Sequence, residues 1–187
     1  MFYAVNIKSL KKITSVTLFL AVMILFARFI ALPYLFPKKY SEYVEKFAEI
    51  YHLDENLVYA VIKTESNFNA QAQSHKWAKG LMQISDTTGI WAGEEIGIEN
   101  FDVDMLFTPE INIEAGCWYL NRLIAQYGGE IDTALAAYNA GSGNVSRWLQ
   151  NDDYSRDGKT LSAIPYEETL KYVKKVNFRK MIYDYLY

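Results

Sequence analysis

Apolar residues after Pro37 recur at steps of three and four positions, which is the spacing of a helix that buries one face. Asp54 can cap the helix that follows it, Pro109 sits near the start of another helix, and Gly128 ends that one. The predicted inward faces are Tyr40, Val44, Phe47, Ala48 and Tyr51; Leu57, Val58, Val61 and Ile62; and Ile113, Gly116, Leu120, Leu123, Ile124 and Tyr127. No stretch alternates apolar and polar residues for long enough to make a convincing strand, so the pattern predicts an all-α domain.

The carboxyl-terminal part of the chain continues this helical pattern. Asp132 is expected to cap a short helix that ends at Gly141, and the polar residues 151–162 are expected to form a loop. Pro165 is expected to open a last long helix, whose first turn carries two glutamates where acids favour the helix dipole. We expect no internal repeat.

The amino-terminal segment 13–36 is uncharged apart from Arg28 and follows Lys8, Lys11 and Lys12. A buried core helix, a cleaved signal peptide and an uncleaved membrane anchor would each account for such a stretch. The core helix is disfavoured because no polar face recurs at helical spacing. An anchor is favoured over cleavage because no small-residue cleavage pattern follows the apolar run.

The predicted anchor divides the chain into residues 1–37, a cytoplasmic basic segment with the membrane span, and a folded domain over 38–187. Under the positive-inside rule the amino-terminal lysines stay in the cytoplasm, which places the folded domain outside it. Cleavage of a signal peptide remains the alternative.

The composition of the folded domain argues against nucleic-acid binding, an intrachain disulfide and a metal site. Four of the 19 basic residues and none of the 22 acidic residues precede Lys38, so the remainder has a formal charge of −7, which disfavours nucleic acid as a partner. The single cysteine, Cys117, excludes an intrachain disulfide, and it lies apart from His52 and His75. No metal-ligand pattern is therefore predicted.

Glu65 occupies a position where the helical pattern predicts an apolar residue. Glu65 continues the inward face of the helix that begins after Asp54, and helical geometry points it toward the interior or a cleft floor. Apolar walls keep such a carboxyl group protonated near neutral pH, which suits a general acid. The alternative, equally weighted from periodicity alone, is a Glu at a fraying helix end that reaches solvent or pairs with Lys63 or Lys76.

Five sequence blocks bear on that choice. They are ESNFN from Glu65, GLMQI from Gly80 to Ile84, PEINIEAGCWYL from Pro109 to Leu120, AAYNAGSGNV from Ala136 to Val145, and IPYEETLKYVKKV from Ile164 to Val176. In this order and spacing they resemble the catalytic domain of the soluble-type lytic transglycosylases of glycoside hydrolase family 23, over residues 41–185. The resemblance implies a lysozyme-like helical fold of the goose type.

The resemblance also implies an activity. Members cut the β-1,4 bond between N-acetylmuramic acid and N-acetylglucosamine in peptidoglycan without consuming water, and leave a 1,6-anhydro ring. Their single catalytic acid and base corresponds to Glu65, and no cofactor is implied. A muramidase that hydrolyses the same bond, or a non-catalytic glycan-binding or assembly module, remains an alternative.

By the same resemblance, six further residues are expected to bind substrate. They are Ser74, Met82, Gln83, Tyr138, Asn139 and Glu168. Without the resemblance, Ser74 would be an ordinary loop hydroxyl, Met82 a core residue and Tyr138 a packing residue.

The chain departs from the family pattern around the second block. His75 replaces a proline and Trp77 replaces a glycine, so Trp77 could stack on a sugar or cover the cleft rim. A Met-Pro pair is replaced by Ser85 and Asp86. If Asp86 faced the cleft, it could raise the pKa of Glu65 or support hydrolysis.

Overall fold

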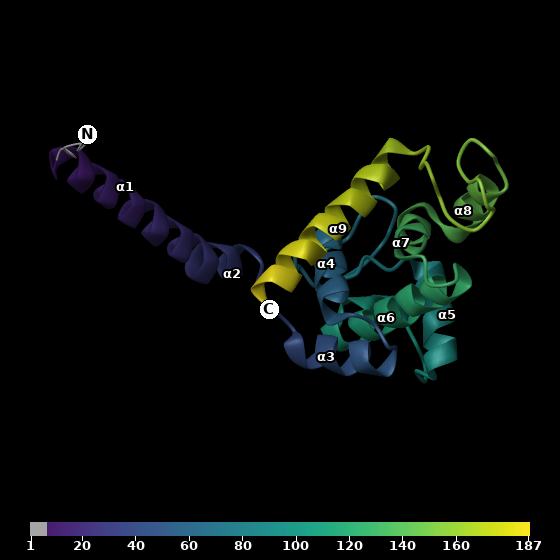
Figure 1. Ribbon diagram of the computed structural model, residues 1–187. Helices are drawn as coiled ribbons and strands as arrows, with labels where there is room; N and C mark the ends of the chain where they lie inside the picture. The colour runs from purple at the N-terminus through teal and green to yellow at the C-terminus, as the bar shows by residue number, and fades with distance from the viewer. Residues whose placement is uncertain (1–6) are drawn as a thin grey trace. The chain divides into compact units, whose positions relative to one another are not determined.

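The computed structural model of the protein describes residues 7–187 and contains helices but no β-strand within that range (Figure 1). The extended pairing that it shows is limited to isolated bridges from Lys79 to Gln73 and Ile84. This confirms the predicted all-α class. The chain forms two compact units, one over the residues up to Pro37 with Leu186–Tyr187, and the other over Lys38–Tyr185.

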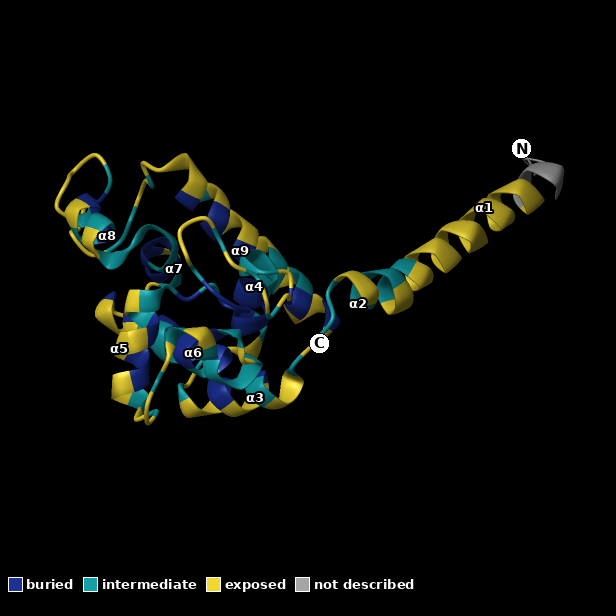
Figure 2. Cartoon of the chain, turned by 180° about the vertical axis from the view of Figure 1, so that it is seen from behind, coloured by how far each residue is buried: buried dark blue, intermediate teal, exposed yellow. Residues whose placement is uncertain are grey.

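The amino-terminal unit is helical throughout its apolar segment. Its elements are α1 (Ile7–Phe26), a π-helical turn η1 (Ala27–Ala31) and α2 (Leu32–Leu35). The helical span Lys11–Leu35 has 25 residues, an 18-residue window within it has a mean hydropathy of 2.3, and no residue of that window is buried within the protein (Figure 2). By length and composition this segment can cross a membrane, whose hydrocarbon core is about 30 Å thick.

The second unit is built around one long helix. Its elements are α3 (Ser41–Ile50), α4 (Glu55–Glu65), α5 (Asp86–Ile96), a 3₁₀ turn η2 (Val103–Phe107), α6 (Pro109–Gln126), α7 (Ile131–Ala140), α8 (Ser142–Leu149) and α9 (Glu167–Leu186). Helix α6 contacts α3, α5, η2 and α7, and therefore forms the centre on which the other helices pack.

Helix α4 is buried more completely than its sequence pattern predicts. Asp54 caps it as expected, because Asp54 Oδ1 accepts a hydrogen bond of 3.0 Å from the Leu57 amide. All six residues from Leu57 to Ile62 are buried, including Tyr59, whose ring stacks 5.4 Å from that of Tyr183 on α9. Protein therefore surrounds α4 on all sides, which fixes the position of its last residue, Glu65.

A buried amide joins the loop after α4 to α6. Asn112 is fully buried on α6; its Oδ1 accepts from the Met82 amide at 2.7 Å, and its Nδ2 donates to the carbonyls of Lys79 at 2.9 Å and Leu106 at 2.7 Å. Gly80 passes so close to Asn112 that a Cβ at this position would overlap the Asn112 side chain, and its φ of +75° is a further reason for glycine.

Two predicted helix starts are wrong. Helix α7 begins at Ile131 without a side-chain cap, and Asp132 lies inside its first turn, where it accepts a 2.7 Å hydrogen bond from Asn177. Helix α9 begins at Glu167, two residues later than Pro165 predicts, although both glutamates lie in its first turn as expected. Tyr166, the residue before the helix, packs edge-on against Trp148 with ring centroids 4.9 Å apart.

Gly141 ends α7 as predicted, but the chain enters α8 immediately afterwards. The φ of +87° at Gly141 turns the backbone sharply between α7 and α8. Residues 151–162 form a loop, as expected.

Replacement of Asn112 with Ala is expected to lower the free energy of unfolding by about 3 kcal/mol, because it removes the side-chain partner of the Met82 amide and the Leu106 carbonyl and one of the two donors to the Lys79 carbonyl. Urea unfolding of the full chain in detergent, followed by tryptophan fluorescence, measures the change. Asn121→Ala on the same helix is the matched control and should change stability by less than about 0.5 kcal/mol. Equal effects of the two substitutions would contradict the role given to Asn112.

Candidate active site

The carboxyl group of Glu65 lies at the end of α4 with protein atoms around most of it, although part of the side chain remains accessible through a pocket mouth. Burial raises the pKa of this carboxyl group from 4.5 to about 7, since a low-dielectric environment disfavours the charged form. Within residues 7–187, no second carboxylate contributes to this shift. The structure thus favours the inward-facing interpretation of Glu65 over a solvent-exposed helix end.

Two tyrosines surround Glu65. The Tyr172 hydroxyl approaches the Glu65 carboxyl group and lowers its pKa by favouring the carboxylate, which offsets part of the burial effect. This approach falls short of standard hydrogen-bond geometry, because among the described residues no partner meets that geometry at the buried Tyr172 Oη. Tyr138 also lies within electrostatic reach of Glu65, whose charge contributes to raising the pKa of the Tyr138 hydroxyl after the larger effect of burial.

Two neighbouring pockets form the candidate cleft. The first, of about 550 Å³, is lined by Thr64, Glu65, Asn139, Glu168, Lys171, Tyr172 and Lys175. The second, of about 320 Å³, has walls that include Lys76, Gln83, Thr88, Tyr119, Tyr138 and Asn139. Asn139 lines both pockets, so the two adjoin this residue.

Four of the six expected substrate-binding residues line this cleft: Gln83, Tyr138, Asn139 and Glu168. Gln83 Nε2 donates to the carbonyls of Ala72 at 3.1 Å and Gly80 at 2.9 Å, so its amide also holds the loop together. Asn139 Oδ1 accepts a 2.8 Å hydrogen bond from Thr169, which fixes the orientation of its amide. Glu168 is exposed.

Met82 and Ser74 differ from the expectation that they line the cleft. The Met82 side chain is fully buried against Gly116, and only its backbone serves the site, since its carbonyl accepts a 2.9 Å hydrogen bond from Tyr138 Oη. Ser74 lines neither pocket. Its Oγ instead accepts from the amides of Lys76 at 3.2 Å and Ala78 at 3.1 Å, and this closes the turn that contains them.

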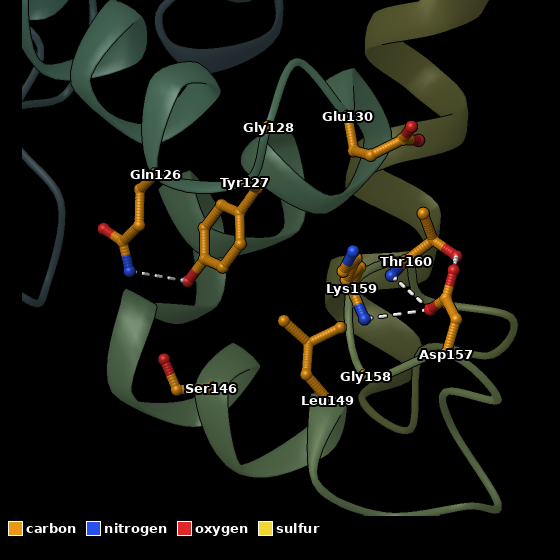
Figure 3. A pocket seen from close by; sticks show the side chains of 10 residues that line it. All are labelled: Gln126, Tyr127, Gly128, Glu130, Ser146, Leu149, Asp157, Gly158, Lys159 and Thr160. Atoms are coloured by element: carbon orange, nitrogen blue, oxygen red, sulfur yellow. Dashed lines mark hydrogen bonds between the residues drawn. The ribbon is translucent and has the colours of Figure 1, made fainter.

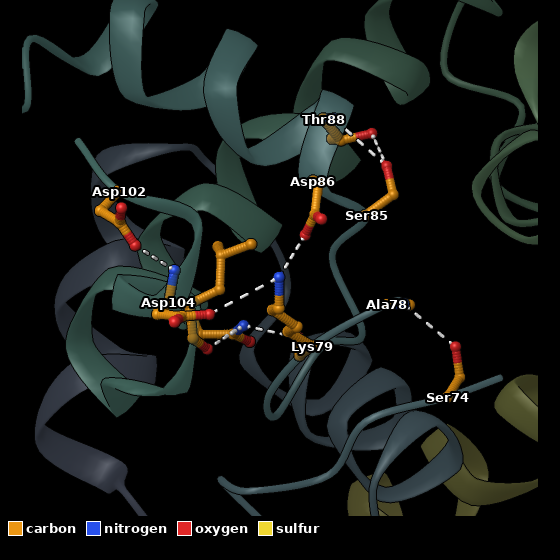
Figure 4. A network of polar contacts seen from close by, with 10 residues as sticks. Ser74, Ala78, Lys79, Ser85, Asp86, Thr88, Asp102 and Asp104 are labelled. Carbon is orange, nitrogen blue, oxygen red and sulfur yellow. Dashed lines mark hydrogen bonds and ion pairs between the residues drawn. The ribbon is translucent and has the colours of Figure 1, made fainter. Parts of the chain in front are cut away.

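Asp86 forms an ion pair with Lys79 (Figure 4). Asp86 Oδ1 lies 2.6 Å from Lys79 Nζ, and Lys79 is buried with Asp104 3.8 Å away on its other side. The Asp86 carboxylate is therefore directed to Lys79, and it does not contribute to the pKa of Glu65.

Trp77, the other departure from the family pattern, is 66% exposed and has a φ of +64°, a conformation that favours glycine. It lines neither of the two cleft pockets.

Sequence reasoning missed two residues of the site. Tyr172 lies four residues after Glu168 on α9, and this helical spacing was the available signal. Ser66, the residue after Glu65, donates from Oγ to the Leu81 carbonyl at 2.8 Å and thereby ties the end of α4 to the loop at 80–84. Its position inside the ESNFN block gave no indication of that long-range bond.

A third pocket, of about 650 Å³, contains none of the predicted site residues. It lies between the end of α6, α8 and the loop at 157–160 (Figure 3). Its Asp157 carboxylate accepts hydrogen bonds of 2.8 Å from the amides of Lys159 and Thr160, so this group stabilises the loop. The pocket offers no buried acid comparable to Glu65.

The described part of the chain contains no group of side chains that could bind a metal ion. No group of three His, Cys, Asp or Glu side chains between residues 11 and 187 is arranged to hold an ion. Cys117 is fully buried, as expected of a small core residue, and burial raises the pKa of its thiol.

Glu65→Gln is expected to stabilise the fold in a pH-dependent way. Because the pKa is about 7 in the folded chain and 4.5 without burial, stability is lost in the wild type as pH rises from about 4.5 to 7 and then stays constant. The variant lacks this loss. The difference in free energy of unfolding between variant and wild type should therefore be about 1 to 3 kcal/mol more favourable to the variant at pH 8 than at pH 4.5. Urea unfolding across this range measures the difference, with the exposed Glu94→Gln as control; a difference that does not vary with pH would contradict the burial of Glu65.

Comparisons with known proteins identify the family of the chain. Residues 42–161 match the family described as the Transglycosylase SLT domain. The soluble lytic murein transglycosylase of Escherichia coli K12 is 32% identical over 154 residues, which cover 81% of this chain and 23% of the relative. Membrane-bound lytic murein transglycosylase C of Edwardsiella ictaluri is 32% identical over 163 residues, covering 74% of this chain and 45% of the relative.

Solved structures show the same fold. The 70 kDa soluble lytic transglycosylase of Escherichia coli superposes with a TM-score of 0.73 at 29% identity, over 82% of this chain and 25% of that one. An inactive Glu-to-Gln mutant of the lytic transglycosylase Slt from Pseudomonas aeruginosa superposes with a TM-score of 0.71 at 30% identity, over 81% of this chain and 25% of that one. The chain thus spans about a quarter of the soluble relatives. The family match over more than half of the sequence, together with this likeness of fold, shows that the chain belongs to the Transglycosylase SLT domain family and has its lysozyme-like fold.

Proposed function

We propose that this protein is a peptidoglycan lytic transglycosylase, which cleaves the β-1,4 bond between N-acetylmuramic acid and N-acetylglucosamine and leaves a 1,6-anhydromuramic end. The observation that carries the proposal is the enclosed carboxyl group of Glu65, whose pKa is about 7. Such a group holds a proton near neutral pH and can also accept one, which suits a residue that acts first as an acid and then as a base.

In the proposed reaction, Glu65 donates its proton to the leaving oxygen of the glycosidic bond. The N-acetyl group of the muramic sugar stabilises the positive anomeric carbon, and the Glu65 carboxylate then removes the proton of the 6-hydroxyl group as that oxygen forms the anhydro ring. A nucleophile held within the same sugar reaches effective molarities of about 10⁵ M or more, so it can compete with water.

The cleft residues have distinct proposed roles. Gln83, Tyr138, Asn139 and Glu168 line the two pockets and bind the glycan. Met82 acts through its carbonyl, which positions Tyr138. Ser74 shapes the adjoining turn and contacts no substrate in this proposal.

The structure gives no specific support to hydrolysis of the same bond. That alternative rested on a second carboxylate near Glu65, and the candidate, Asp86, is paired with Lys79 at 2.6 Å. A non-catalytic glycan-binding module is disfavoured for a different reason, because binding alone gives no cause to bury a carboxyl group. Relatives named lytic murein transglycosylases, and a complex of the 70 kDa enzyme with bulgecin A, support the catalytic assignment.

We further propose that the segment 13–36 anchors the protein in a membrane and that residues 38–187 form an extracytoplasmic catalytic domain facing the cell wall. The length and hydropathy of the Lys11–Leu35 helical window support the anchor, as does the similarity to a membrane-bound relative. The lysines before the span support the orientation under the positive-inside rule.

Glu65→Gln is expected to lower the rate of glycan cleavage at least about 100-fold, because Gln neither donates nor accepts the required proton. The assay uses purified sacculi and the full chain in detergent, and mass spectrometry identifies the products. Anhydromuramic ends from the wild type support the proposal, and binding to sacculi shows that the variant still holds glycan. Reducing muramic ends, or undiminished turnover by the variant, would contradict it.

The rate of the wild type should fall on the alkaline side of about pH 7, by about tenfold per pH unit in kcat/KM, as Glu65 loses its proton. Tyr172→Phe removes the hydroxyl that lowers this pKa, so its alkaline limb should move to higher pH. The control Tyr166→Phe lies outside both cleft pockets and should leave the limb in place. A limb that stays fixed or moves to lower pH in Tyr172→Phe would contradict the contact with Glu65.

A further inference from the structure

One face of α9 forms a wall of the Glu65 pocket. Glu168, Lys171, Tyr172 and Lys175 line this pocket and follow one another at helical spacing. The proposed reaction uses Tyr172 and Glu168 but gives no role to the two lysines. Their presence in the same pocket as the catalytic acid therefore requires its own explanation.

The two lysines differ in what they contact. Lys171 Nζ lies 2.6 Å from Glu167, an exposed pair one helical turn apart. Within the described range 7–187, no acidic group lies within ion-pair distance of Lys175. Lys175 thus offers an ammonium group at the pocket without a protein counter-ion.

The lysines do not serve to tune the acid. Burial and Tyr172 account for the pKa of Glu65, and neither lysine contributes. Of the two described lysines that line this pocket, Lys171 pairs with Glu167, and Lys175 pairs with no described carboxylate.

We propose that Lys175, assisted by Lys171, binds a carboxylate of the peptide that branches from the muramic sugar, so that the enzyme favours peptide-bearing strands. This inference rests on the proposed function. The sugar rings and their N-acetyl groups are uncharged, and in a peptide-bearing strand the lactyl carboxyl group is consumed in an amide bond. The free carboxylates of the peptide are then the anions that lie beside the scissile bond.

The geometry matches this chemistry. The peptide branches from the sugar whose anomeric carbon Glu65 must approach, so a group in the same pocket as Glu65 lies within reach of it. An exposed ammonium–carboxylate contact is weak and screened by salt. The expected effect is therefore a preference of about threefold to tenfold that falls at high ionic strength, and it should appear in KM, since the contact forms before the reaction.

The test compares three glycan substrates freed of phosphate-containing polymers: strands with native peptides, the same strands with peptide carboxylates converted to carboxamides, and strands stripped of peptides by an amidase. The variants are Lys175→Gln and Lys171→Gln/Lys175→Gln in the full chain in detergent. Lys174→Gln is the matched control, since Lys174 is also exposed on α9 but lines neither pocket of the cleft.

We expect Lys175→Gln to raise KM about threefold to tenfold on native strands and to leave cleavage of carboxamide strands unchanged, while Lys174→Gln matches the wild type on both. A loss confined to peptide-free strands would overturn the peptide assignment and place the exposed lactyl carboxylate in the site. An equal loss on all three substrates, or no loss, would overturn carboxylate recognition altogether. Failure of the proposed function is distinguishable, because the wild type would then release no anhydro product from any substrate.

Discussion

The site depends on the removal of one carboxyl group from water at the end of a helix that is itself buried. The residues Leu57 to Ile62 of α4 are all buried, so the helix is enclosed by protein, and Glu65 at its end faces the pocket with most of its carboxyl group enclosed. Its raised pKa follows from that enclosure and not from a neighbouring charge. A single carboxyl group that is neutral near pH 7 can give a proton and then take one back, and the proposed chemistry requires nothing more of it.

The loop that faces Glu65 is held by polar groups that satisfy one another. Ser66 joins the end of α4 to Leu81, Asn112 holds Met82 from the side of α6, and the Met82 carbonyl fixes Tyr138 on α7. Each bond links segments far apart in sequence, and each partner is enclosed enough that its loss would leave an unsatisfied group. The opposing walls of the cleft are thus positioned by the same backbone segment, which explains how a loop can provide a rigid site.

Local signals predicted the parts of the structure that depend on local physics. The Asp54 cap and the buried face of Leu57, Val58, Val61 and Ile62 follow from helix geometry and hydrophobic spacing, and the structure has both. The same spacing left Glu65 between the interior and solvent, and the structure directs it inward. Asp132 misled because a carboxylate near a helix start can also bond to a distant side chain, here Asn177. Met82 and Ser74 were assigned to the cleft by position in a block, but packing against Gly116 and closure of a local turn determine where their side chains point. Helical spacing places Tyr172 on the same face of α9 as Glu168, but its approach to Glu65 depends on how α9 packs in the fold, which that spacing does not give.

The contact between Gly116 and Met82 has a consequence for how this sequence can diverge. A Cβ at Gly116 would overlap the Met82 side chain, so α6 and the loop share one volume at this point. A larger residue at position 116 requires a smaller one at position 82, because with Met82 unchanged it would displace the loop whose Met82 carbonyl accepts the hydrogen bond from Tyr138. We therefore expect positions 116 and 82 to vary together among descendants of this sequence, with a small residue on α6 wherever the loop keeps a side chain as large as methionine.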